Sequence, residues 1–121
     1  MGKSIMVIDD DRVSSEIVKR KLQEAGYDIA TAIHGEDALA QLNKKPVDLI
    51  LLDVEMPVMN GYTFITQRAQ IPALKPIPVI VLTAHKENKP LFQRHSVRAY
   101  LLKPLNLQEL LDQVAKVIGP A

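Results

Sequence analysis

The chain has 121 residues, 47% of them hydrophobic, and a formal net charge of +1. This length suits one domain with one core, so residues 1–121 are expected to form a single domain. The small net charge argues against direct nucleic-acid binding, no apolar run is long enough to cross a membrane, and the lack of cysteine excludes disulfides and fits a cytoplasmic location.

Short apolar segments alternate with amphipathic ones in the first half of the chain. A strand is predicted over residues 3–8, directly before the acids Asp9, Asp10 and Asp11. A helix follows, ended by Gly26, in which these apolar residues recur at helical spacing: Val13, Ile17, Val18, Leu22 and Ala25. A second strand is predicted over residues 27–32, and a second helix from Gly35 with its inward residues Ala38, Leu39 and Leu42.

The central segment is a strand predicted over residues 47–53. Its unbroken apolar run, residues 49–52, stops at Asp53, and Pro57 and Asn60-Gly61 then break the pattern. Such a run, bounded by turn residues, is typical of a strand buried on both faces of a parallel sheet. A short helix over residues 62–69 is expected to follow.

The last third repeats the alternation. A strand over residues 79–82 ends at Thr83, and a loop over residues 84–89 is expected to lead into a short helix through His95. A fifth strand over residues 98–102 precedes Lys103-Pro104. Asn106 then caps a last helix whose apolar face comprises Leu107, Leu110, Leu111, Val114, Val117 and Ile118. Five strands that alternate with five helices predict an α/β fold with one parallel sheet and helices on both faces.

Polar residues follow the strands at the points where each strand ends. Asp9-Asp10, Asp53, Thr83 and Lys103 occupy these positions, and the carboxyl ends of parallel strands share one sheet edge. Crowded carboxylates repel one another unless a cation joins them, and Mg²⁺ prefers oxygen ligands. A lysine and a hydroxyl beside that cation would bind a phosphoryl group, which one carboxylate could accept.

Each of these residues also has a simpler interpretation. Asp53 can be a turn residue, and the acids from Asp9 to Asp11 can form a turn and a helix cap. Thr83 can bond nearby backbone, and Lys103 can be a solvated charge. Their coincidence at four strand ends favours a common site.

From about Ser4 to Ile118 the chain resembles the receiver domain of two-component response regulators. The resemblance rests on Asp9-Asp10, on the D-x-x-M-P-x-M-x-G segment from Asp53 to Gly61, on Thr83-Ala84 and on Lys103-Pro104. It implies a flavodoxin-like sheet with strand order 2-1-3-4-5 and a Lys103–Pro104 bond that is commonly cis.

The resemblance also implies residue roles. Asp53 would accept the phosphoryl group. Mg²⁺ would be bound directly by Asp10, mostly through water by Asp9, and by Asp53 and the backbone carbonyl of Glu55. Lys103 would pair with the phosphoryl oxygens, while Thr83 and Tyr100 would form a switch that alters the surface of the fourth helix, fifth strand and fifth helix. The implied donor is a histidine kinase or a phosphotransfer protein, and the implied output is binding of a downstream protein.

Two features bear on partners and on departures from the family pattern. The second half of the chain is basic, with Lys86, Lys89, Arg94 and Arg98 near the implied output surface, so an acidic partner is a hypothesis that competes with a simply solvated surface.

Pro90 and the missing Ala-Gly pair depart from the family pattern and predict a short or displaced fourth helix. Glu55 and His85 occupy positions that tune phosphoryl lifetime in the family.

Other functions remain open at this stage. A metal-dependent aspartyl phosphatase would use Glu55 as its acid/base, but the following Gly-Thr is missing. A flavodoxin would need a phosphate-binding loop where three aspartates stand. A degenerate receiver that acts as a scaffold would lack a site residue, and none is missing. No output segment follows the last helix, so we expect either a stand-alone receiver or one cut from a longer protein.

Overall fold

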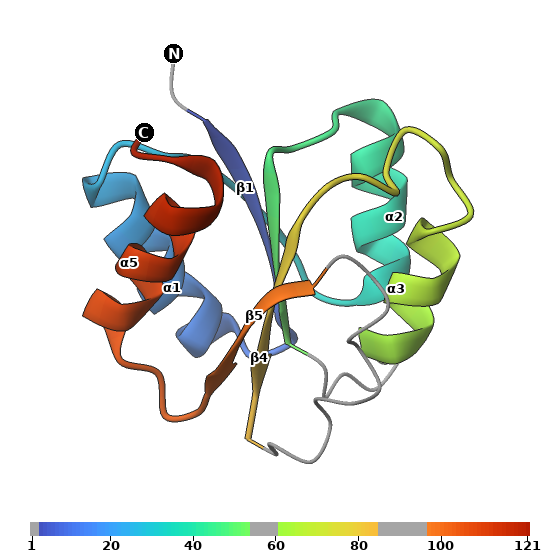
Figure 1. Ribbon diagram of the computed structural model, residues 1–121. Helices are drawn as coiled ribbons and strands as arrows, with labels where there is room; N and C mark the ends of the chain where they lie inside the picture. The colour runs from blue at the N-terminus through green and yellow to red at the C-terminus, as the bar shows by residue number, and fades with distance from the viewer. Residues whose placement is uncertain (1–2, 54–60, 85–96) are drawn as a thin grey trace.

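The computed structural model describes residues 3–53, 61–84 and 97–121. Five strands and four helices are present in these ranges (Figure 1). The strands are β1 (Ser4–Ile8), β2 (Asp28–Ala32), β3 (Leu49–Asp53), β4 (Val79–Thr83) and β5 (Val97–Leu102). The helices are α1 (Arg12–Glu24), α2 (Gly35–Lys44), α3 (Gly61–Arg68) and α5 (Leu107–Ile118). The fourth helix that the sequence predicts lies outside the described residues.

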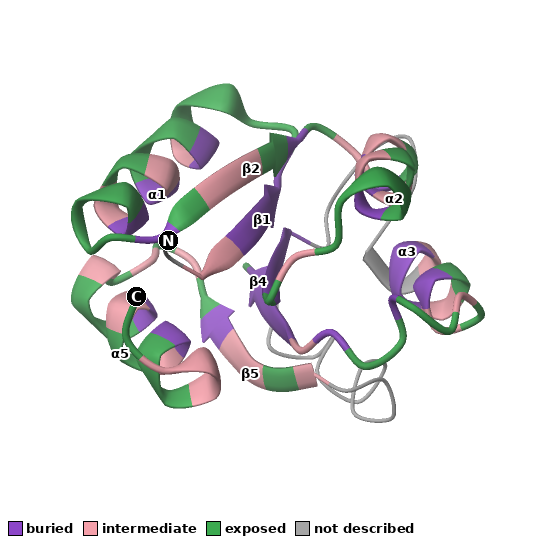
Figure 2. Ribbon diagram, turned by 90° about the horizontal axis from the view of Figure 1, so that it is seen from above, coloured by how far each residue is buried: buried purple, intermediate pink, exposed green. Residues whose placement is uncertain are grey.

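All strands form one parallel sheet in the order β2-β1-β3-β4-β5, which confirms the predicted fold class and strand order. Helices α1 and α5 cover one face of the sheet, and α2 and α3 cover the other (Figures 1 and 2). Strands β3 and β4 are buried along their whole length, as their unbroken apolar sequences predict.

The sheet separates the core into two apolar clusters. Alternate residues of each strand point to opposite faces, so Met6, Ile8 and Leu52 pack with α2 and α3, whereas Val7 and Leu51 pack with α1 and α5. The proline-rich connection between α3 and β4 also contributes to the first cluster through Leu74 and Ile77.

Three helices begin with a side chain that accepts a backbone N–H bond. Asp11 caps α1, and Asn106 caps α5 by accepting from the Glu109 N–H, as its position in the sequence predicts. His34 caps α2 through Nδ1, which accepts from the Asp37 N–H, and the sequence pattern did not reveal this cap. Gly26, with φ of 102°, follows α1 as predicted.

The apolar stripe of α1 is only partly buried. Val18 and Leu22 join the core, whereas Val13 is 71% exposed and Ile17 is 50% exposed. The five apolar residues of the predicted stripe span more of the helix circumference than the sheet can cover, so one side of α1 carries apolar side chains into solvent.

The far end of α5 is fastened to the beginning of the sheet. Lys3 Nζ donates to the Ile118 carbonyl, and Tyr27 Oη donates to the Gly119 carbonyl at 2.9 Å. A cation at the last carbonyls of a helix complements the helix dipole. Among the described residues, no helix combines the length and the apolar character needed to cross a bilayer.

Candidate phosphoryl-transfer site

The register of the sheet brings the polar strand ends together. Ile8 pairs with Leu52, so Asp9 and Asp53 follow directly on neighbouring strands. Asp53 in turn pairs with Leu82, which precedes Thr83, and Thr83 pairs with Leu102, which precedes Lys103. The four strand ends that the sequence singled out therefore lie side by side at one edge of the sheet.

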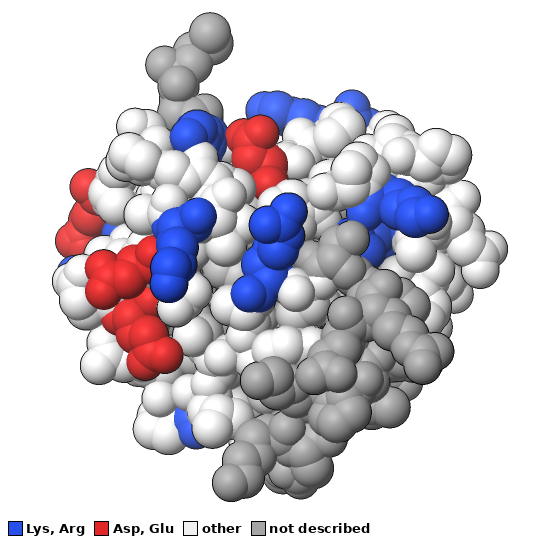
Figure 3. Space-filling view, in the orientation of Figure 1, with Lys and Arg blue, Asp and Glu red and all other residues white. Residues whose placement is uncertain are grey.

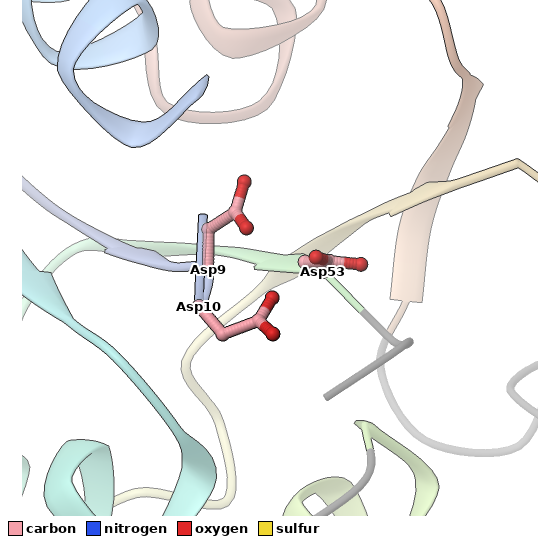
Figure 4. Close-up of side chains that lie close together, drawn as sticks. All are labelled: Asp9, Asp10 and Asp53. Atoms are coloured by element: carbon pink, nitrogen blue, oxygen red, sulfur yellow. The ribbon is translucent and has the colours of Figure 1, made fainter. Parts of the chain in front are cut away.

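Three carboxylates converge at this edge. One carboxylate oxygen from each of Asp9, Asp10 and Asp53 lies within 4.8 Å of the others. Figure 4 shows the carboxylates at the ends of β1 and β3, with that of Asp10 pointing toward Asp53. Asp9 and Asp53 are buried, at 4% and 3% exposed, whereas Asp10 is exposed. Two buried acids and one exposed acid form a site that solvent reaches from one side.

Asp11, the third acid of the run, has a different role. Its side chain caps α1: Oδ1 accepts from the Val13 N–H at 3.0 Å, and Oδ2 accepts from the Ser14 hydroxyl at 3.0 Å. These bonds, chiefly that from the Ser14 hydroxyl, lower the pKa of Asp11 below its ordinary value. The cap interpretation of the acidic run therefore holds for Asp11, whereas Asp9 and Asp10 lie beside Asp53.

Lys103 supplies the positive charge at the site. Its Nζ lies 3.2 Å from Asp53 Oδ2, and its backbone N–H donates to the Thr83 carbonyl at 2.8 Å. Thr83 is buried at 1% exposed. The contact between Lys103 and Asp53 contradicts the interpretation of this lysine as a solvated charge, and the Lys103–Pro104 bond is cis as expected.

Tyr100 lies on the face of β5 that packs toward α2 and α3. Its ring contacts the core cluster on that side, and its hydroxyl oxygen is buried. This burial raises the pKa of Tyr100 above its ordinary value. The sequence also assigned Glu55 and His85 to the site, and both lie outside the described residues.

An apolar surface beside the site was missed by the sequence interpretation. A groove of about 280 Å³ runs from Asp9 and Lys103 along α1 to the segment after β5. It is lined by Asp9, Ser14, Ile17, Val18, Lys103, Pro104, Leu105 and Leu107. The signal available in the sequence was the excess width of the α1 apolar stripe, which exceeds what one core-facing side can bury.

Comparison with known proteins places this arrangement in a family. A family model described as the response regulator receiver domain matches residues 5–115. Transcriptional regulatory protein ZraR of Salmonella typhimurium is 37% identical over 118 residues, which cover 95% of this chain and 26% of that protein. The probable transcriptional regulator ycf29 of Porphyra purpurea is 31% identical over 120 residues, which cover 98% of this chain and 57% of that protein. The chain thus spans from about a quarter to little more than half of these relatives.

The chain also superposes on solved structures of receiver-type proteins, and each superposition covers nearly all of both chains. Chemotaxis protein CheY4 of Vibrio cholerae superposes with a TM-score of 0.90 at 32% identity, covering 97% of this chain and 99% of that one. The receiver domain of the sensor histidine kinase PA1611 of Pseudomonas aeruginosa PAO1 has a TM-score of 0.89 at 25% identity, covering 98% and 99%. That structure holds a magnesium ion coordinated in its active site cleft.

Proposed function

Because the chain belongs to the family of response regulator receiver domains of two-component systems, we propose that Asp53 is its phosphoryl acceptor. The observation that carries the proposal is the contact of Lys103 with Asp53 inside a cluster of three carboxylates. A buried carboxylate at a strand end, next to a cation and a hydroxyl, has the surroundings that an aspartyl phosphate requires.

Asp53, Lys103 and Thr83 have different tasks in the phosphoryl transfer. An oxygen of Asp53 forms a bond to phosphorus while the bond between phosphorus and the donor atom breaks, and the donor leaves with that electron pair. Lys103 neutralises charge on the phosphoryl oxygens, and the Thr83 hydroxyl donates a hydrogen bond to one of them. Thr83 and Tyr100 act together as the switch, since contacts made only in the phosphorylated state shift the balance between two conformations.

The donor set fits Mg²⁺. Three carboxylates within 4.8 Å supply the hard oxygen ligands that this ion prefers, and the exposed side of Asp10 leaves room for the waters it retains. Asp9, Asp10 and Asp53 would hold the ion, together with the carbonyl of Glu55. When bound, it offsets carboxylate repulsion and the charge of the incoming phosphoryl group.

The donor is a histidine kinase or a phosphotransfer protein, and the surface of α1 is where it docks. Val13 and Ile17 present apolar side chains to solvent on α1, and Ile17 also lines the groove that contains Asp9 and Lys103. Clustered exposed apolar residues next to a reactive group mark a protein contact more often than isolated ones do. Replacing Val13 and Ile17 by glutamate should slow transfer from the protein donor and leave transfer from acetyl phosphate unchanged.

The downstream target is a protein with an acidic docking surface. Arg98 is exposed on β5, whereas Lys86, Lys89 and Arg94 lie outside the described residues. On the face seen in Figure 3, the Lys and Arg side chains of the described residues form separate groups without one continuous patch. This distribution suits charge steering of a protein better than tracking of a nucleic-acid backbone. The chain acts as a single cytoplasmic signalling domain, and its output is binding, not metabolic turnover.

The deciding experiment is phosphorylation of the purified chain by acetyl phosphate with Mg²⁺, read by intact mass and by mapping of the modified residue. Wild-type protein should gain one phosphoryl group on Asp53. The Asp53→Asn variant, which keeps the shape of the side chain, should gain none. Modification of another residue in the wild type, or equal modification of the variant, would contradict the proposal.

A further inference from the structure

Asp11 stands outside the group of three carboxylates but is bonded to it. Its backbone N–H donates to Asp9 Oδ1 at 2.9 Å. Asp9 is only 4% exposed, so the orientation of its carboxylate depends on protein donors more than on water. The residue directly after the acidic pair therefore influences a candidate metal ligand through its main chain.

We propose that Asp11 is a positioning residue for the divalent-cation site, which it serves by holding the Asp9 carboxylate in place. The inference rests on the proposed function, because it takes Asp9 to help hold the cation, mostly through a water molecule. Groups that hydrogen-bond a metal-binding side chain fix its orientation, and their loss commonly weakens the affinity of the protein for the metal.

The side chain of Asp11 keeps its own N–H in position. The residue has an extended backbone (φ −89°, ψ 108°) immediately before the first helical residue of α1. Three bonds hold it there, from the Val13 N–H, the Ser14 N–H at 3.4 Å and the Ser14 hydroxyl. Alanine at this position makes none of them, so the turn that presents the Asp11 N–H to Asp9 loses its anchor.

The charge of Asp11 is a separate contribution that must be distinguished from positioning. A negative charge near the site attracts a cation wherever the side chain points. Asparagine keeps an acceptor oxygen for the cap and is as good a capping residue as aspartate, but it carries no charge. The pair Asp11→Asn and Asp11→Ala therefore separates electrostatic attraction from the positioning of Asp9.

The test is a Mg²⁺ titration of the full chain by NMR and calorimetry. Asp11→Ala should weaken Mg²⁺ binding about tenfold, the lower range for loss of a group that orients a metal ligand. Asp11→Asn should weaken it less than about threefold, since only a screened charge is lost. The hydrogen bond to Asp9 should shift the amide proton of residue 11 downfield in the metal-free wild type. This shift should be lost in the alanine variant and kept in the asparagine variant.

A matched control lies at the opposite edge of the sheet. Tyr27→Phe removes the bond to the Gly119 carbonyl and lowers stability without touching the acids, so it should leave Mg²⁺ affinity unchanged. Ser14→Ala provides a milder change that keeps the fold, and it should weaken Mg²⁺ binding by less than Asp11→Ala does.

The outcomes separate this inference from the proposed function. Equal losses in Asp11→Asn and Asp11→Ala would mean that charge alone acts, and this would overturn the positioning role. An unchanged affinity for Mg²⁺ in both Asp11→Ala and Ser14→Ala would also overturn the positioning role. The proposed function would still stand, because the wild type would bind Mg²⁺. A wild-type protein that binds no Mg²⁺ would overturn both.

Discussion

Three consecutive aspartates have different surroundings because α1 begins directly after them. Asp9 and Asp10 follow the end of β1 and lie close to Asp53, whereas Asp11 turns toward the first N–H groups of the helix. Sequence pattern alone left the ligand and cap interpretations open for the whole run. The choice depends on the residue at which the helix starts, and local composition fixes helix boundaries poorly.

The pKa of Asp11 gives a test at the residue scale. Its bonds to Ser14 lower this pKa below the ordinary value of 3.8. The folded state is thus stabilised relative to the unfolded state above pH 3.8, and this contribution is lost as the pH falls further through the lowered pKa. Ser14→Ala removes the largest cause, so the pKa of Asp11 should move back toward 3.8, as measured by NMR titration of its side chain. An unchanged pKa would show that the hydroxyl bond is not formed in solution.

The other site residues were predictable because they depend on register and alternation. Asp53, Thr83 and Lys103 end or follow strands, and parallel pairing brings strand ends together whatever their distance in sequence. Tyr100 faces inward because alternate residues of β5 point to opposite faces. The movement proposed for Tyr100 as a switch is a difference between two states, which register and alternation do not encode.

At the scale of elements, the strands were predicted more closely than the surfaces of the helices. Short continuous apolar runs bounded by turn residues indicate β3 and β4, since a strand covered on both faces is apolar throughout. Some apolar residues of α1 pack in the core and others are exposed to solvent, and their spacing in the sequence does not distinguish the two groups. The sheet determines this distinction by how far it extends beneath the helix.

Arg68 is a residue whose role was hidden in the sequence. At the end of α3 it resembles a solvated charge, yet it is 1% exposed, and burial lowers its pKa. Its Nη2 donates to the Lys75 carbonyl at 3.0 Å and to the Ile77 carbonyl at 2.6 Å. It thereby joins α3 to the connection that leads into β4.

Replacement of Arg68 by methionine should therefore destabilise the fold. The variant fills similar space but leaves two carbonyls without this donor, at a cost of roughly 2–4 kcal/mol in the free energy of unfolding. Chemical denaturation followed by circular dichroism measures the loss. Lys75→Ala, which keeps the backbone carbonyl, serves as the control and should change stability by less than about 0.5 kcal/mol. A methionine variant as stable as the wild type would show that water replaces the guanidinium.

At the scale of the whole molecule, we expect the repulsion among the three carboxylates to lower stability until a cation binds. Three carboxylates share a small region, with Lys103 as the basic partner in contact with Asp53. Asp10→Asn removes one of these charges and should raise the melting temperature of the chain in EDTA. The same change should abolish most of the rise in melting temperature that Mg²⁺ causes in the wild type.

The magnitude of that gain follows from binding linkage. Mg²⁺ at a hundredfold excess over its dissociation constant adds about 2.7 kcal/mol to the wild type, which corresponds to roughly 8–12 °C for a domain of this size. Differential scanning fluorimetry with and without Mg²⁺ measures both proteins. A similar Mg²⁺ shift in the wild type and the Asp10→Asn variant would mean that the ion binds elsewhere.

The attachment of α5 to the first strand has a consequence for protein engineering. Lys3 reaches the Ile118 carbonyl and Tyr27 reaches the Gly119 carbonyl, so the beginning and the end of the described chain are neighbours on the side remote from the acids. A short peptide can bridge them, and the ring so formed can be reopened in an exposed loop such as that between α2 and β3. Circular permutants and insertions into host proteins built this way should leave the acidic end of the sheet unchanged.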